Sequence, residues 1–279
     1  MRRILREFRL AGRGLHGGEE GAVRVRPGEP GAGLLVGRDG AFEPLRPDLA
    51  VPGTARCTEL RLAGGAVRTV EHLLAAVTGC GIRDARLEFE GPEVPILDGS
   101  ALPWVERLLE VSEAAEAEPP RSDGGVRRLR AGESRYEAVP AARTRLDVEY
   151  AVAHPWIGRR RAVWGGQTES FVREVAPART FARREELERI FAAGQARGGS
   201  LECAVVLGPD GPLGGPLRFP DEPVRHKLLD LLGDLALCGA PPAFRVRAVQ
   251  PHHAANGRLA RLLSGSGGDD GADQSAQAT

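Results

Sequence analysis

The first 110 residues combine strand-like stretches with two helical ones. Strands are predicted where apolar residues alternate with polar ones or dominate short runs, at residues 22–25, 34–36 and 85–90. Residues 69–77 carry apolar side chains at helical spacing, and Thr69 stands where an N-cap is expected. A second helix is predicted to begin near Ser100, after a turn-forming Asp-Gly pair.

The second half repeats this mixture. Residues 145–153 alternate like a strand, residues 183–193 form a charged amphipathic pattern typical of a helix, and residues 200–207 predict another strand. The strongest helical pattern covers residues 224–238 and is expected to end at Gly239, which two prolines follow closely. Strands and helices mixed in both halves indicate the α+β class.

Two segments lack the apolar residues that a folded core needs. Residues 112–125 are acidic and contain two prolines, so we expect a linker between a first domain (1–111) and a second domain (126–263). Residues 264–279 are of low complexity, and we expect this tail to be disordered.

The two strongest helical stretches resemble each other. Val, His, Leu and Gly recur at the same spacing in residues 70–79 and 224–233. The match predicts two related halves, each presenting a histidine from an equivalent helix. If the halves face each other, His72 and His226 meet at their interface.

Composition narrows the class of protein. The chain has 38 basic and 38 acidic residues, so it lacks the positive charge of a general nucleic-acid binder, and no nucleic-acid partner is expected. No apolar run reaches the length of a membrane helix, and no signal peptide is evident. The cysteines show no CxxC spacing, which favours a reducing compartment. We therefore expect a soluble, cytoplasmic protein.

The helix at residues 224–238 carries a polar face among leucines. His226, Asp230 and Asp234 follow one another at four-residue intervals, so their side chains line one side of the helix. A buried carboxylate without a partner is costly, so these groups need a cation. Either a metal ion or some of the many arginines can supply it.

The pair Glu71-His72 in the first helix favours a metal. His72 together with His226 and Asp230 gives two histidines and one carboxylate, a ligand set that leaves a position open for water. The Glu71 side chain would lie about 100° around the helix from that of His72, so its carboxylate can reach such a water without binding the metal. Zn²⁺ suits this set, and Fe²⁺ suits it as the facial triad of an oxygenase.

Two long segments and several short motifs carry a resemblance to a known family. The segments are TVEHLLAAVTGCGIRDARLEFEGPEVPILDGSA (69–101) and DEPVRHKLLDLLGDLALCG (221–239), and the shorter motifs are GRGLHGG, HPWIG, ARTF, GGSLECAVV and HAAN. In this order, and over nearly the whole chain to about residue 263, they resemble the UDP-3-O-(3-hydroxyacyl)-N-acetylglucosamine deacetylases. That family consists of zinc enzymes of the committed step of lipid A synthesis.

The resemblance implies a fold and a set of roles. It implies two related β-α-α-β domains of sandwich type, packed face to face with the active site between them. The implied Zn²⁺ ligands are His72, His226 and Asp230. The remaining implied roles are those of Glu71 as general base, His253 as general acid, Asp234 as the group that orients that acid, Thr180 as oxyanion stabiliser and Lys227 as contact to the substrate diphosphate. His252 is the alternative acid.

The same resemblance concerns the substrate and its surroundings. It implies a UDP-linked acylated amino sugar whose fatty chain occupies a passage built by an insert in the second domain. We expect the passage and its rim to include Phe181, Leu187, Leu201, Cys203, Val206 and, near the active site, His16. A monomer with transient contact to the inner membrane is expected.

Three departures from the family pattern bear on the substrate. Ala182 and Arg183 follow the ARTF motif where the family has Gly-Phe, Pro223 replaces a phenylalanine, and Pro251-His252 replaces Ser-Gly before His253. They leave the metal chemistry intact but put the preferred acyl length in question. The alternatives are a zinc deacetylase acting on another acylated amino sugar, an iron oxygenase and a non-catalytic binding relative.

Overall fold

The computed structural model describes residues 1–54, 56–116, 125–152, 154, 157–239 and 243–265. In the first half, the strands and helices are β1 (Arg2–Ile4), β2 (Phe8–Arg13), β3 (Glu20–Pro27), β4 (Leu34–Arg38), β5 (Ala41–Pro44), β6 (Glu59–Leu62), β7 (Gly65–Arg68), α1 (Glu71–Gly79), β8 (Ala85–Glu90), α2 (Leu102–Glu110) and β9 (Ser112–Ala114).

In the second half they are β10 (Arg127–Ala131), β11 (Ser134–Pro140), β12 (Arg145–Val152), β13 (Gly158–Trp164), α3 (Thr168–Glu174), β14 (Phe181–Arg183), α4 (Leu187–Ala192), β15 (Val205–Gly208), β16 (Gly211–Leu213), α5 (Glu222–Leu235), β17 (Phe244–Val249) and α6 (His253–Leu263). Short 3-10 turns lie at Pro47–Leu49, Arg184–Glu186 and Ala236–Cys238.

The two halves have the same sheet topology. The first sheet has the strand order β2-β3-β8-β4-β5, and the second has the order β10-β11-β17-β12-β13. In both sheets the third and fourth strands pair in parallel, whereas the other neighbours pair antiparallel. The prediction of two related α+β halves is therefore confirmed.

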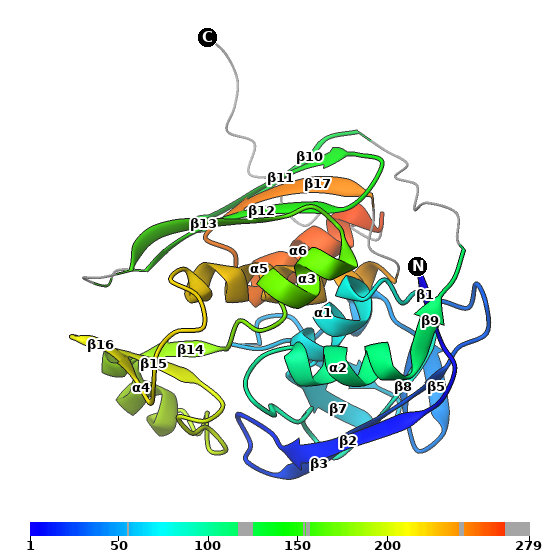
Figure 1. Ribbon diagram of the computed structural model, residues 1–279, viewed down its shortest axis with the longest axis horizontal. Helices are drawn as coiled ribbons and strands as arrows, with labels where there is room; N and C mark the ends of the chain where they lie inside the picture. The colour runs from blue at the N-terminus through cyan, green and yellow to red at the C-terminus, as the bar shows by residue number, and fades with distance from the viewer. Residues whose placement is uncertain (55, 117–124, 153, 155–156, 240–242, 266–279) are drawn as a thin grey trace.

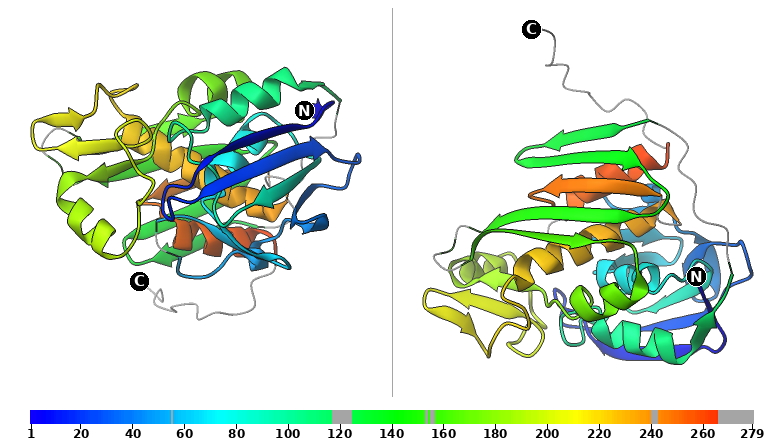
Figure 2. Two further views of the ribbon diagram at one scale, coloured as in Figure 1. Left: turned by 90° about the horizontal axis from the view of Figure 1, so that it is seen from below. Right: turned by 45° about the horizontal axis from the view of Figure 1, so that its top comes forward.

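Apart from α4, which belongs to an insert, the helices lie between the two sheets (Figure 1). Strands β10 to β13 and β17 form the upper layer of the picture, and β2, β3 and β8 lie in the lower one, with α1 and α5 in contact at the centre. The insert made of β14, β15, β16 and α4 projects from one side of this sandwich (Figure 2). No helix in the described part of the chain is long and apolar enough to cross a membrane.

Burial follows the sequence pattern of each layer. In β17, Phe244, Val246 and Ala248 face the helices, whereas the two intervening arginines are exposed. This alternation is typical of a sheet with one face on the core. All nine residues of α1 are buried, as are most of those of α5, because each of these helices packs against elements on several sides.

Three local predictions were wrong. Thr69 does not cap α1, because its backbone has a φ of +60° and Val70 precedes the helix. Of residues 183–193, only 187–192 form an α-helix, after a strand and a 3-10 turn. Of residues 200–207, only the end is a strand, because the N–H groups of Cys203 and Ala204 donate to the Ser200 carbonyl and close a turn.

The boundaries of the predicted linker and tail differ in part. Residues 112–114 form β9, which pairs with β1, so the start of the predicted linker belongs to the first half. Residues 117–124 of the linker and 266–279 of the tail lie outside the described part of the chain. Residues 264 and 265 form a turn after α6.

Two glycines allow the helices to approach each other. A Cβ atom at Gly233 would lie 2.0 Å from the carbonyl oxygen of Glu71, so α5 touches the backbone of α1 at this point. At the equivalent position of α1, a Cβ on Gly79 would lie 2.3 Å from the ring of Phe171 in α3. The glycine shared by the two helical stretches thus marks close packing in both halves.

We predict that Gly233→Ala lowers the free energy of unfolding by about 1–3 kcal/mol or more, because its methyl group must push α1 and α5 apart. Urea unfolding followed by circular dichroism measures the change. Gly257→Ala in α6 is the matched control, since its Cβ would meet no atom within 4 Å; alanine should leave stability equal or up to about 1 kcal/mol higher. Equal effects of the two substitutions would contradict the prediction.

Candidate active site

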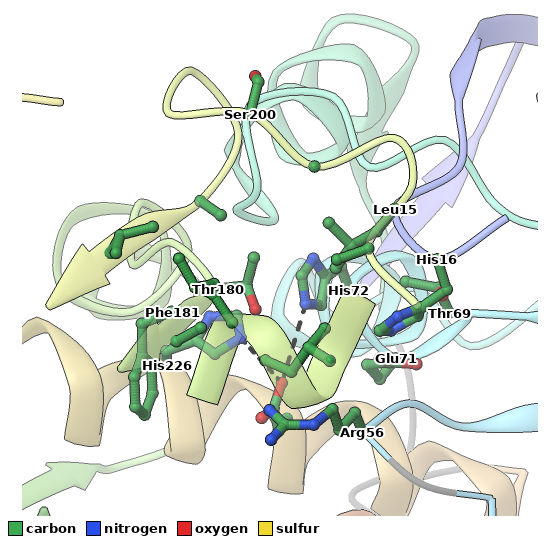
Figure 3. Close-up of a pocket in the computed structure, with 18 of the residues that line it drawn as sticks. Leu15, His16, Arg56, Thr69, Glu71, His72, Thr180, Phe181, Ser200 and His226 are labelled. Carbon is green, nitrogen blue, oxygen red and sulfur yellow. Dashed lines mark ion pairs between the residues drawn. The ribbon is translucent and has the colours of Figure 1, made fainter. Parts of the chain in front are cut away.

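Helices α1 and α5 bring two histidines and an aspartate together. The ring centroids of His72 and His226 lie 5.0 Å apart. Asp230 Oδ1 is 3.3 Å from His226 Nε2 and 3.8 Å from His72 Nε2. All three side chains are buried, and one ligand atom from each lies within 4.8 Å of the others. Figure 3 shows His72 and His226 close together among the residues that line the pocket, with dashed lines for the ion pairs.

This cluster fits a divalent cation. Among the described residues, Asp230 Oδ1 has no hydrogen-bond partner although it is buried. The Ala178 carbonyl accepts a hydrogen bond from His226 Nδ1 at 3.0 Å, which turns Nε2 of that ring toward Asp230. Burial lowers the pKa of His72 to about 3 and also lowers that of His226, so both rings are neutral. Two neutral imidazoles and one carboxylate are ligands that zinc and iron accept.

A second group of buried polar side chains surrounds Asp234, one turn further along α5. Its Oδ2 accepts hydrogen bonds from His253 Nδ1 at 3.0 Å and from the Asn256 amide at 2.8 Å. Its Oδ1 accepts one from the Thr58 hydroxyl at 2.5 Å. Tyr136 donates to the Asn256 oxygen at 2.7 Å and so fixes that amide. Asp234 is therefore held by four side chains, directly or through one neighbour.

Glu71 is the candidate base and His253 the candidate acid, and the pKa of each group is raised. Glu71 is 2% exposed, and burial raises its pKa to about 8. Burial opposes the charged form of His253, but the charges of Asp234 and Asp230 outweigh it and raise the pKa to about 9. Perturbed groups of this kind in a cavity are typical of functional sites.

These groups lie at one end of a cavity of about 290 Å³. The sequence-predicted residues that line it are His16, Glu71, His72, Thr180, Phe181, Leu187, Leu201, Val206, His226, Lys227, Asp230 and His253. Asp234 lies behind His253. Cys203 does not line the cavity but packs with Leu15 and Ile96. His252 faces the outside of α6, and its side chain accepts a hydrogen bond from the Ala255 N–H at the start of that helix.

Several lining residues were not predicted. Those of the insert include Ile190, Phe191, Ser200 and Ala204, and those of the first half are Leu15, Arg56 and Thr69. Ser200 and Ala204 were missed because residues 200–204 were predicted as a strand, whereas Ile190 and Phe191 lie in a helix that was predicted there without its cavity-facing side. Arg56 Nη2 lies 3.6 Å from Glu186 Oε1, so the first half contacts the insert beside the cavity.

The segment that carries Thr180 and Phe181 is fastened to α5. Glu222, at the start of α5, accepts hydrogen bonds from the backbone and the guanidinium of Arg179, both at 2.9 Å. This ion pair is buried, with 1% of the Glu222 side chain exposed. On its other sides, Thr180 donates its N–H to Gly99 and accepts one from Val205, both at 2.8 Å. The segment therefore has little freedom to move relative to His226.

Lys227 lies beside the metal-ligand candidates. Its ammonium donates to Asp230 Oδ2 at 2.8 Å and lies 5.8 Å from the centre of the Phe181 ring and 5.9 Å from that of Tyr150. Burial opposes its charged form, but Asp230 and Tyr150 raise its pKa, so the side chain stays positive. It is the lysine of a chain with a single lysine, and it faces the cavity.

Two α+β halves that share a buried His-His-Asp cluster, with a carboxylate and a His-Asp pair beside it, are the arrangement of a metal-dependent hydrolase. Comparison with known proteins agrees with this class. Residues 1–264 match the LpxC family, described as UDP-3-O-acyl N-acetylglycosamine deacetylase, and the chain belongs to this family.

Its relatives are similar along nearly their whole length. The UDP-3-O-acyl-N-acetylglucosamine deacetylase of Trichormus variabilis is 40% identical over 265 residues, covering 90% of this chain and 94% of the relative. The protein of the same name from Thermosynechococcus vestitus is 41% identical over 263 residues (91% and 90%). That of Myxococcus xanthus is 39% identical over 266 residues (91% and 83%).

We predict that Asp230→Ala and His226→Ala each lower the metal content of the purified protein from about one ion per chain to about a tenth of that or less. Two remaining ligands do not hold the ion against dialysis. Mass spectrometry of the metals in the protein measures the loss and also tells zinc from iron. Asp221→Asn is the control, because Asp221 precedes the same helix and pairs with Arg225 instead. Full metal content in either alanine variant would contradict the assignment.

Proposed function

We propose that this protein hydrolyses the acetamide of a UDP-3-O-acyl-N-acetylglucosamine and releases acetate, the committed step of lipid A biosynthesis. The observation that carries the proposal is the placement of Glu71, His253 and the His-His-Asp cluster together at the end of a largely apolar cavity. Family membership over residues 1–264 supports the same activity. An oxygenase or a non-catalytic relative has no comparable support.

We infer that His72, His226 and Asp230 hold Zn²⁺. The ion supplies a Lewis acid that polarises the amide carbonyl and makes a water molecule more acidic. The buried, neutral imidazoles and the Asp230 carboxylate suit this ion by ligand type. Iron remains the alternative that metal analysis separates from it.

Glu71 takes a proton from the attacking water. A divalent ion bound beside it would lower the raised pKa of this carboxyl group and keep it ionised. The Glu71 carboxylate is adjacent to the ligand His72 but is itself held by the Thr58 N–H at 3.0 Å, which leaves its other oxygen available to the cavity. The new bond joins the water oxygen to the carbonyl carbon. Thr180, fastened between Gly99 and Val205, is placed to donate its hydroxyl to the oxygen that becomes negative.

His253 donates a proton to the nitrogen as the carbon–nitrogen bond breaks. An amine leaves poorly unless it is protonated, and the raised pKa of about 9 keeps this imidazole charged at neutral pH. Asp234 holds the ring through Nδ1, so Nε2 is the atom that can face the substrate. Acetate and the free amino sugar are the products.

The remaining substrate contacts rest on charge and apolarity. Lys227 provides the positive charge that a diphosphate requires. Phe181, Leu187, Leu201 and Val206 provide apolar surface for an acyl chain, and Ile190 and Phe191 extend it. His16 is buried beside the polar end of the cavity. Cys203 acts only through its packing against Leu15. A cytoplasmic location, contact with the inner membrane and a monomeric state stay predictions.

We predict that Glu71→Gln lowers kcat for acetate release by about 10²- to 10⁴-fold, because the amide cannot accept the proton of water. The metal content should remain near that of the parent protein, as measured on the same sample. Glu188→Gln, an exposed substitution in α4, is the control and should leave kcat unchanged. Unchanged turnover in Glu71→Gln would reject the base. Absence of acetate release by the metal-loaded parent with every acyl length tested would reject the function.

We predict that Val206→Phe reduces kcat/KM about tenfold or more for long-chain substrates while affecting short-chain ones less, because the added ring fills the apolar part of the cavity. Competition between substrates of different acyl length measures the preference. Val163→Phe is the matched control, since Val163 is 40% exposed on the outside of the second sheet. An unaltered length profile in Val206→Phe would place the acyl chain elsewhere.

A further inference from the structure

Thr58 lies between the two candidate proton-transfer groups, although neither a motif nor its position in the chain marks it. It precedes β6 in the first half and is 6% exposed. Its N–H donates to Glu71 Oε2 at 3.0 Å, and its hydroxyl donates to Asp234 Oδ1 at 2.5 Å. The hydroxyl oxygen is also 3.4 Å from His253 Nδ1. One residue of the first half therefore contacts the base and the partner of the acid.

The donors and acceptors around Thr58 fix the direction of each of its hydrogen bonds. The hydroxyl has one proton, and at 2.5 Å that proton lies toward the carboxylate of Asp234. Asp234 then uses Oδ2 for His253 and Asn256, and Oδ1 for Thr58. Without the hydroxyl, Oδ1 would be a buried carboxylate oxygen lacking this donor, and the carboxylate could turn away from the plane that orients His253.

The contact of the Thr58 N–H with Glu71 depends on the contact of the Thr58 hydroxyl with Asp234. The Thr58 carbonyl accepts a hydrogen bond from the Val70 N–H at 3.4 Å, a long contact, so of these two contacts of Thr58 the hydroxyl–carboxylate bond is the firmer. If the loop shifts, the N–H that fixes Glu71 Oε2 shifts with it. The sequence separation of 176 residues between Thr58 and Asp234 means that this bond crosses from one half of the protein to the other.

We propose that Thr58 is a positioning residue that couples the two halves of the proton-transfer apparatus, holding Glu71 through its amide and His253 through Asp234. The inference rests on the function proposed above. Thr58 does not line the main cavity and so does not act on the substrate directly. It sets the orientation of the two groups that do, so its loss affects turnover rather than substrate affinity.

The test uses a matched pair of substitutions in the metal-loaded protein. Thr58→Val keeps the shape and volume but removes the hydroxyl, whereas Thr58→Ser keeps the hydroxyl and removes the methyl group. We expect Thr58→Val to lower kcat by about 10- to 100-fold, the range that corresponds to a lost hydrogen bond to a charged group, with little change in KM. Thr58→Ser should restore most of kcat. Bound metal should be the same in all three proteins.

A second readout does not depend on activity. The imidazole proton on Nδ1 of His253, observed by NMR in protein labelled with ¹⁵N at histidine, reports the hydrogen bond to Asp234. Its chemical shift should change in Thr58→Val and keep the parent's value in Thr58→Ser. The measurement stands even if the parent does not turn over the tested substrate, so failure of the proposed function is distinguished from failure of the role of Thr58.

A double-mutant cycle with Asp234→Asn separates positioning from general stability. If Thr58 acts through Asp234, Thr58→Val costs much less activity in the Asp234→Asn protein than in the parent. Equal losses in the two backgrounds would overturn the proposal. So would an unchanged imidazole resonance in Thr58→Val, or a Thr58→Ser protein as slow as Thr58→Val.

Discussion

The contact between α1 and α5 is the constraint on which the site depends. The two helices touch where Gly233 meets the backbone of Glu71, a distance that no residue with a Cβ atom allows. This approach places the imidazoles of His72 and His226 5.0 Å apart, although they are 154 residues apart in the chain. Each helix also packs on its own half, so the separation of the two histidines is fixed by the cores of both halves together.

Burial and polarity oppose each other at this contact and explain its chemistry. Helices enclosed between two sheets lose water from every side, which is why the histidines are neutral and the Glu71 carboxyl binds protons more tightly than it would in water. The protein offsets the cost by pairing: Asp234 receives hydrogen bonds from three side chains, and His226 donates to a carbonyl. Asp230 Oδ1 has no such hydrogen-bond partner among the described residues, which agrees with its proposed role as a metal ligand.

Much of the fold was predictable because its signals are local and repeated. The helix at 224–238, the strand at 145–152 and the shared Val-His-Leu-Gly spacing all arise from residues near one another in the chain. The insert was harder: its charged stretch 183–193 resembles a helix, yet a strand that pairs with the distant β15 takes its first residue. The N-cap prediction at Thr69 failed for a similar reason, since its hydroxyl donates to Glu93, far along the chain.

The site residues divide in the same way, into those with a local signal in the sequence and those that matter because of distant partners. His226, Asp230 and Asp234 could be found from spacing on one helix, and Glu71-His72 from adjacency. Thr58 and Glu222 could not, because their importance comes from partners 176 and 43 residues away. Asn256 lies between these cases: it ends the HAAN motif that carries the family resemblance, but only the fold joins it to Asp234.

The two halves share a topology, but the site between them is not symmetric. The halves contribute equivalent histidines, yet their neighbours differ, because the counterpart of Glu71 in α5 is Arg225, whose guanidinium binds Asp221 and stacks over Phe219. The correspondence between α1 and α5 therefore includes the two histidines but not the residues before them. In the proposed mechanism the base Glu71 comes from the amino-terminal half and the acid His253 from the carboxy-terminal half, so attack on the amide and departure of the amine are served by different halves of the chain.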